Sequence, residues 1–178
     1  ELAAAPVLPD LDPGPSQACP KDMRLVEGVH HDELGHLCTD PRDDAKTSHC
    51  YGYHEDLTLL EGTARPVRVC MDQYEAPNLR GARPMVLQSH DSASRWCAKS
   101  RKRLCSEREW ELGCEGPRHL PWAYGWRVNV KLCNSAKGWK KVDFEAFGKT
   151  REEARAETER LWQGSARGRY APCVSPFG

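Results

Sequence analysis

The 178-residue sequence has no long run of apolar residues and no net charge. Its apolar stretches fall short of the roughly 18 residues that a membrane-spanning helix needs. Its 26 basic residues balance 26 acidic ones, so the strong positive charge of a typical nucleic-acid-binding protein is missing, and nothing favours an anionic membrane as a partner. We therefore expect no nucleic-acid partner and no transmembrane segment.

The sequence also lacks the short motifs of common hydrolases. It contains no G-x-S-x-G turn. His31 and His36 invite comparison with the H-E-x-x-H motif of metalloproteases, but they are five residues apart and Asp32, not glutamate, follows His31. Five residues advance a helix by about 500°, which places the two rings on different faces. Because nearby glycines suit a loop better than a helix, we predict that His30, His31 and His36 are exposed loop residues.

Close cysteine pairs are absent too, although cysteine itself is abundant. The nine cysteines are never closer than the eight positions between Cys97 and Cys105, whereas a structural zinc site uses pairs such as C-x2-C. In a hydrophilic chain this pattern favours disulfides and an oxidising compartment. An odd number leaves at least one cysteine without a partner in this chain.

The N-terminal part divides into a tail and the start of a folded domain. Residues 1–18 contain four prolines and predict a disordered tether, which we interpret as the segment that follows a removed signal peptide. Short strands are expected at residues 23–26 and 67–71. The cysteines at 19, 38, 50 and 70 form a set with three pairings open. Of these we favour Cys38–Cys50 as a loop staple and Cys19–Cys70 as a link between strands.

Helix signals are clearest at residues 106–117. Ser106 and Glu109 form a capping box, and Gly116 with Pro117 stops the helix, which predicts a helix over residues 107–115. Cys105 and Cys114 then lie too far apart to pair with each other.

Two further helices are expected. One starts at Ser89 and carries Trp96 and Cys97 on its inner face, and the other spans residues 151–163 behind a Thr150–Glu153 capping box, with a Glu157–Arg160 pair. We interpret the tryptophans at 110, 122 and 126, with Tyr124, as an aromatic core rather than a ligand groove.

Four ordered motifs resemble one known family. They are RLCSEREWELGC at residues 103–114, CMDQYEAPN at 70–78, PWAYG at 121–125 and CVSPFG at 173–178. Together they are similar to the formylglycine-generating-enzyme, or sulfatase-modifying-factor, family. The cysteines within these motifs resemble a secreted bacterial branch of that family. Residues 150–164 have no counterpart in that family and read as a helical insertion.

The resemblance implies an α+β fold of the irregular, strand-poor, C-type-lectin-like kind, stapled by disulfides, over residues 19–178. It implies that the C-terminal part of the fold is missing, so we expect a continuation of this polypeptide, or a second chain, to pack against the face of Trp110 and Phe177. By the same resemblance, Cys97 and Cys114 would bond to that segment. Asp72, Tyr74 and Glu75 are expected to anchor loops.

The resemblance also frames the chemistry. Family enzymes convert a substrate cysteine to formylglycine with a copper-binding cysteine pair that lies beyond this chain, so no catalytic residue carries over. We expect a secreted, periplasmic or cell-surface binding or scaffold module that is not catalytic by itself and has a protein partner. The alternative is a copper-dependent oxidase completed by the missing segment. A structural calcium ion is implied at Asn134, the Ser135 carbonyl and Asp143, while a simple turn cap by Asn134 remains the other interpretation.

Overall fold

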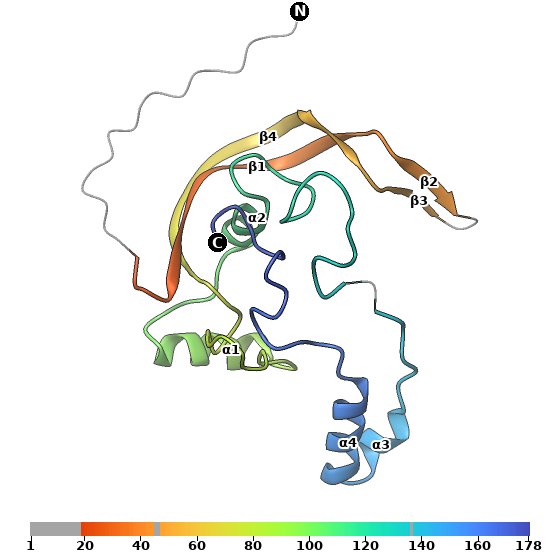
Figure 1. Ribbon diagram of the computed structural model, residues 1–178. Coiled ribbons are helices and arrows are strands. Elements are labelled where there is room, and N and C mark those ends of the chain that lie inside the picture. The colour runs from red at the N-terminus through yellow and green to blue at the C-terminus, as the bar shows by residue number, and fades with distance from the viewer. Residues whose placement is uncertain (1–18, 45–46, 136) are drawn as a thin grey trace, which may run out of the picture.

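A long antiparallel ribbon and several short helices make up the computed structural model, which describes residues 19–178 apart from 45, 46 and 136 (Figure 1). The expected α+β class is confirmed. Within the described residues, sheet is limited to two antiparallel two-stranded pairs, β1 with β4 and β2 with β3. The predicted tether at residues 1–18 lies outside the described residues.

The ribbon is formed by β1 (Met23–Cys38) and β4 (Tyr53–Asp72), of 16 and 20 residues. Its register runs from Met23 opposite Asp72 to Cys38 opposite Tyr53, with irregularities after His31 and after His36. The short strands expected at residues 23–26 and 67–71 are the two ends that meet at its base. Their lengths were underestimated because polar residues follow the apolar ends and obscure the strand pattern.

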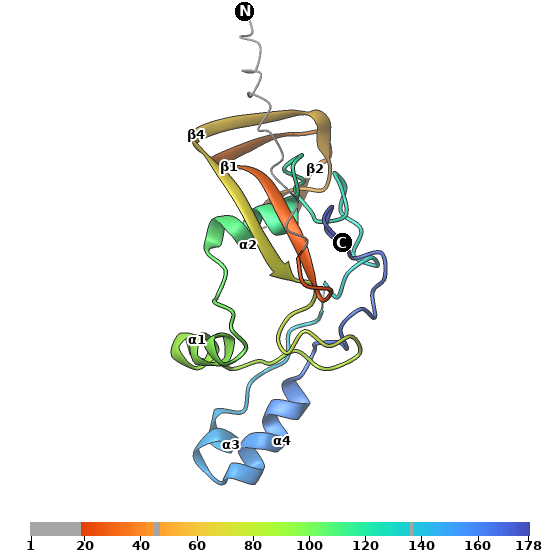
Figure 2. The same ribbon diagram turned by 90° about the vertical axis from the view of Figure 1, so that its left-hand side faces the viewer.

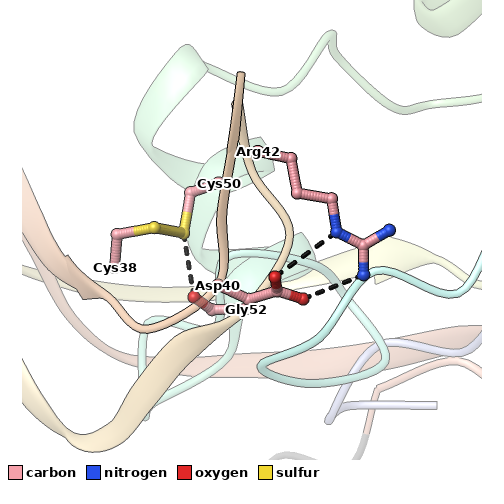
Figure 3. Close-up of a disulfide and its surroundings, with 5 residues drawn as sticks. All are labelled: Cys38, Asp40, Arg42, Cys50 and Gly52. Atoms are coloured by element: carbon pink, nitrogen blue, oxygen red, sulfur yellow. Dashed lines mark hydrogen bonds and ion pairs between the residues drawn. A yellow bond between two sulfur atoms is a disulfide. The ribbon is translucent and has the colours of Figure 1, made fainter. Parts of the chain in front are cut away.

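A smaller hairpin occupies the tip of the ribbon, where the sequence suggested only a loop. It consists of β2 (Pro41–Asp44) and β3 (Thr47–Cys50), and the Cys38–Cys50 disulfide closes it onto β1 (Figure 3). The Cys50 sulfur lies 2.8 Å from the Gly52 carbonyl oxygen, and Arg42 donates to Asp40 at 3.0 Å.

Three disulfides join the described chain. Cys38–Cys50 and Cys19–Cys70 have Cα separations of 5.8 and 5.6 Å, so the pairing favoured from the sequence is confirmed. A third, Cys133–Cys173, with a Cα separation of 4.9 Å, ties the C-terminal segment to the loop after residue 130. The remaining three cysteines are unpaired. Cys105 and Cys114 therefore do not bond to each other, as predicted from the length of the helix between them.

Helix α2 (Glu107–Glu115) has the predicted boundaries and caps. The Glu109 N–H donates to the Ser106 hydroxyl at 3.4 Å, and the Ser106 N–H donates to the Glu109 carboxylate at 2.8 Å. Gly116 ends the helix with a φ of 71°. A Cβ at that position would lie 2.4 Å from the Pro176 side chain, so only glycine fits there.

The core lies where α2 crosses beneath the ribbon, and it is small. Leu112 is fully buried against Val26 and Val67, with Val69, Met71 and Phe177 partly buried around them. The ribbon and the helix are in close contact at Gly28, where a Cβ would lie 3.4 Å from a Leu112 methyl carbon. Burying such side chains contributes about 1.5–3 kcal/mol each.

The other helices lie farther from the core. Helix α1 (His90–Lys99) begins at the predicted Ser89 cap. Helix α4 (Arg151–Leu161) has the predicted Thr150–Glu153 capping box but ends two residues before Gln163. It packs on the short α3 (Phe144–Gly148), and both views place this pair away from the ribbon (Figures 1 and 2).

The prediction of exposed loop histidines is wrong. His30, His31 and His36 lie on β1, and His30 is only 5% exposed. The strand was missed because these residues interrupt its apolar alternation, and the histidines lie close to polar partners from α2 and the loop that follows it.

The predicted aromatic core is only partly present. Trp126 is buried, with 7% of its surface exposed, whereas Trp110 on α2 is 61% exposed. Helical spacing gives the face on which Trp110 lies but cannot give the element that covers it.

Replacing the α2 cap should destabilise the fold measurably. We expect Ser106→Ala to lower the free energy of unfolding by about 1 kcal/mol, because a first-turn N–H loses its acceptor next to the core helix. Urea denaturation followed by circular dichroism measures the change. Ser94→Ala, inside α1, is the control and should have little effect, since alanine favours helix interiors. Equal midpoints for Ser106→Ala and the parent chain would contradict the role of this cap.

Candidate functional site

A broad hollow of about 1530 Å³ lies in the described part of the chain. The base of the ribbon, α1, α2 and the C-terminal segment all contribute to its walls. Its apolar lining includes Val69, Met71, Trp96, Trp110 and Phe177. Residues far apart in the sequence therefore meet around one open space.

All three unpaired cysteines line this hollow. Cys97 on α1 and Cys114 on α2 are half-buried, and Cys105, between the two helices, is exposed. An exposed free thiol is uncommon in a protein that otherwise forms disulfides, since an oxidising compartment consumes it. The cysteines that form no disulfide within the described chain therefore all lie around this hollow.

The surroundings of two thiols make them poor nucleophiles. Burial raises the pKa of Cys114, and the nearby charge of Glu115 raises it further. Burial likewise raises the pKa of Cys105, with a further rise from Glu109. Because the thiolate is the reactive form, neither Cys114 nor Cys105 has the surroundings of a catalytic nucleophile.

Charged residues close one side of the hollow. Lys102 donates to the Asp72 carboxylate at 2.5 Å and lies 3.5 Å from Asp22. The hydrogen bond to Asp72 raises the Lys102 pKa, despite partial burial. Asp72 therefore joins the end of β4 to the segment between α1 and α2, in agreement with the loop-anchoring role predicted for it.

The rest of the CMDQYEAPN motif is also held by hydrogen bonds. The Tyr74 N–H donates to the Asn78 side chain at 2.9 Å, and the Asn78 N–H donates to the Glu75 carbonyl at 2.8 Å. Asn78 is buried and also donates to the Asp22 carbonyl at 2.8 Å. The sequence resemblance pointed to Tyr74 and Glu75, but Asn78 makes most of these contacts.

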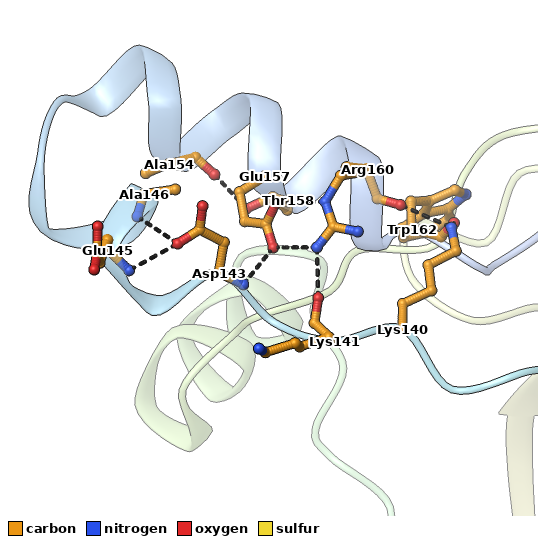
Figure 4. Close-up of polar contacts among 10 residues, drawn as sticks. All are labelled: Lys140, Lys141, Asp143, Glu145, Ala146, Ala154, Glu157, Thr158, Arg160 and Trp162. Atoms are coloured by element: carbon orange, nitrogen blue, oxygen red, sulfur yellow. Dashed lines mark hydrogen bonds and ion pairs between the residues drawn. The ribbon is translucent and has the colours of Figure 1, made fainter.

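The residues expected to bind calcium each have protein partners. Asn134 donates to the Gln163 carbonyl at 2.9 Å and accepts from the Tyr170 hydroxyl at 3.4 Å. Asp143 is the N-cap of α3, with hydrogen bonds of 3.0 and 3.3 Å from the first-turn N–H groups of residues 145 and 146 (Figure 4). Ser135 is exposed. The calcium site stays a prediction.

A polar network holds the α3–α4 pair together. The Arg160 guanidinium donates to Glu157 at 2.6 Å, and the Asp143 N–H donates to the same carboxylate at 2.8 Å (Figure 4). Arg160 first, and then the Asp143 N–H, lower the Glu157 pKa to about 2. The predicted Glu157–Arg160 pair is confirmed, and it serves this helix pair rather than the hollow.

Comparison with protein-family models, with curated proteins and with solved structures finds no match for this chain. No helix among the described residues is long and apolar enough to cross a membrane. The function must therefore be argued from the hollow and its surroundings.

Acid should weaken the anchor of α2 beside the hollow. Arg103 pairs with Glu109 at 2.5 Å and, together with Ser106, lowers the Glu109 pKa from 4.5 to about 2. A depressed pKa adds stability above the unfolded value, and this contribution disappears as the pH falls from about 4.5 to about 2.

We therefore expect Glu109→Gln to be less stable than the parent chain at pH 6, with the difference shrinking through that window. Glu107→Gln removes a charge from the same helical turn but keeps the Arg103 pair, which makes it the control. The urea midpoints of the parent chain and both variants are measured from pH 6 to pH 2. A difference between Glu109→Gln and the parent chain that stays constant over this range would refute the lowered Glu109 pKa.

Proposed function

We propose that this chain is an extracytoplasmic binding or scaffold module, similar to formylglycine-generating-enzyme domains and not catalytic by itself. In this proposal the hollow is its binding surface, and a cysteine-bearing polypeptide segment occupies it. The observation that carries the proposal is the gathering of three unpaired cysteines and the exposed Trp110 around one hollow.

The small core supports this proposal. Only four hydrophobic residues, Val26, Val67, Leu112 and Trp126, are buried in the described part of the chain. Chains of this length usually bury a much larger apolar surface. A segment seated in the hollow would cover Trp110 and extend the core around Phe177.

The cysteines support the proposed compartment and the proposed bond. Three disulfides are what an oxidising compartment permits. Disulfide exchange would supply the link: a thiolate of the segment attacks a mixed disulfide between a cysteine of this chain and a small thiol, bonds to the cysteine sulfur and releases the small thiol as a thiolate. Cys97 and Cys114 are the proposed partners, since the family resemblance points to them and both are half-buried in the wall.

Disulfide mapping of the protein from its native source tests the proposal. Free thiols are alkylated before digestion without reduction, and linked peptides are identified by mass spectrometry. We expect Cys97 and Cys114 in linked peptides whose other half comes from outside residues 1–178, and we expect Cys105 to be alkylated. Cys105 serves as the internal control because it lines the same hollow but is exposed.

Two other outcomes are informative. Alkylation of all three cysteines in a stable 20.1 kDa monomer would refute the proposal. If the linked segment carries a further cysteine pair that binds copper and the assembly converts a peptide cysteine to formylglycine, the module is part of an oxidase and the scaffold role is wrong.

The structural calcium ion at Asn134, Ser135 and Asp143 remains part of the proposal. Oxygen ligands of this kind suit Ca²⁺, and occupancy would stabilise the native state by ligand linkage. We expect millimolar CaCl2, but not MgCl2, to raise the melting temperature of metal-free protein by a few degrees. Asn134→Ala should abolish this shift while Asn129→Ala retains it. An equal effect of both salts would argue against the site.

A further inference from the structure

A second cluster of polar residues lies on the face of α2 next to the one that carries Trp110 and Cys114. Glu111 and Glu115 come from α2, and His119 comes from the turn that follows it. Three histidines of β1 face them: His30, His31 and His36. The loop-anchoring and hollow-lining residues described above do not include this cluster.

One pair within the cluster is already in contact, although the His30 Nδ1 atom is buried without a hydrogen-bond partner. His30 and Glu111 are 2.6 Å apart, through the ring Nε2 and a carboxylate oxygen. This buried contact joins β1 to α2 next to Leu112. We treat it as part of the scaffold that holds the neighbouring residues in place.

Glu115 and His119 are a different case. The Glu115 Oε2 and His119 Nδ1 atoms lie 3.6 Å apart, and both are buried without a hydrogen-bond partner. The His119 residue is only 6% exposed. Leaving such groups unsatisfied costs about 1–3 kcal/mol each, so a missing partner between them would explain the arrangement.

Their spacing is close to that of two ligands on one metal ion. Ligand atoms held at about 2.0–2.1 Å on a tetrahedral zinc ion lie about 3.4 Å apart. The 3.6 Å separation of Glu115 and His119 is near that value. The turn after α2, closed by a hydrogen bond of 2.9 Å from the Leu120 N–H to the Glu115 carbonyl, fixes His119 four residues beyond Glu115.

His31 supplies a third ligand of the same class. Its ring centre lies 5.4 Å from that of His119, with the ring planes at 86°. Two imidazoles on one tetrahedral zinc ion have their centres about 5 Å apart, given Zn–N bonds of about 2.0–2.1 Å.

We propose that Glu115, His119 and His31 form a binding site for a divalent transition-metal ion of the zinc type. Two nitrogens and one carboxylate oxygen suit zinc better than calcium, which prefers oxygen alone. Among the described residues no three such side chains already surround a single point. Binding therefore requires the half-buried His31 ring to rotate toward the Glu115–His119 pair.

His36 lies beside this site but is assigned a different role. Its ring contacts Trp126 and Tyr53, with centroid distances of 5.6 and 5.5 Å. Burial lowers its pKa, the Glu115 charge raises it and the His119 charge lowers it, so it shares their surroundings. It closes the aromatic side of the cluster, and the fourth position on the ion is left to water.

Calorimetric titration of the metal-free full chain with ZnSO4 tests the proposal. We expect one ion per chain, and at least a tenfold loss of affinity in Glu115→Gln, His119→Ala and His31→Gln. His90→Ala is the matched control, because His90 lies on α1 with 83% of its side chain exposed and should leave binding unchanged. His31→Gln spares the buried pair, so it remains informative if the other variants unfold.

Cobalt gives an independent readout of the ligands. Co²⁺ in place of zinc should give the intense visible absorption of a tetrahedral site, and His31→Gln should weaken it while circular dichroism shows an intact fold. Absence of stoichiometric binding overturns the proposal. So does binding that the three variants and His90→Ala affect equally, which would indicate adventitious surface coordination. The proposal is independent of what occupies the hollow.

Discussion

Insertion of Leu112 beneath the ribbon is the contact on which the rest of the structure depends. Its side chain is fully buried, and it meets the ribbon closely at Gly28, where a Cβ would lie 3.4 Å from a Leu112 methyl carbon. Its neighbours Val26 and Val67 come from opposite strands, so one side chain holds both strands and the helix together. A side chain longer than that of alanine at position 28 would have to displace Leu112, since a Cβ there would already be in van der Waals contact with it.

Such a small core needs covalent support. The Cys19–Cys70 disulfide closes a loop of about 50 residues. In the chain-entropy account, such a bond raises the free energy of the unfolded state by about 4 kcal/mol. This bond lies at the base of the ribbon, where register matters most for Val26 and Val67. Cys133–Cys173 acts similarly on the C-terminal segment, which otherwise meets the core mainly through Phe177. The disulfides thus stand in for apolar burial that the described chain does not supply.

Features set by neighbouring residues could be predicted from the sequence, and features set by distant ones could not. The caps at Ser106 and Thr150 are local, and so the starts of α2 and α4 were predicted correctly. The length of the ribbon depends on pairing between residues up to about 50 positions apart. The alternation of apolar and polar residues cannot reveal this pairing where the strands are polar.

The same distinction applies to the two sites. The family resemblance stays a prediction, and the residues it singled out, Cys97, Cys114 and Trp110, all line the hollow. The contact between His31 and His119 joins residues 88 positions apart in the sequence, and no local pattern predicts it. The H-E-x-x-H comparison, which the spacing excluded, concerned histidines of one helix, whereas His31 lies on a strand and His119 in a turn.

Helix α2 connects the two proposed sites physically. Trp110 and Cys114, four residues apart, line the hollow, and Glu111 and Glu115, also four apart, face the histidines. Leu112 lies between these faces, against the ribbon. A segment that fills the hollow would hold α2 more firmly, and so fix Glu115 against His119. A metal ion bound there would in turn fix Cys114. If both ligands favour the same placement of helix α2, the binding of each raises the affinity for the other by an equal factor, because such coupling is reciprocal.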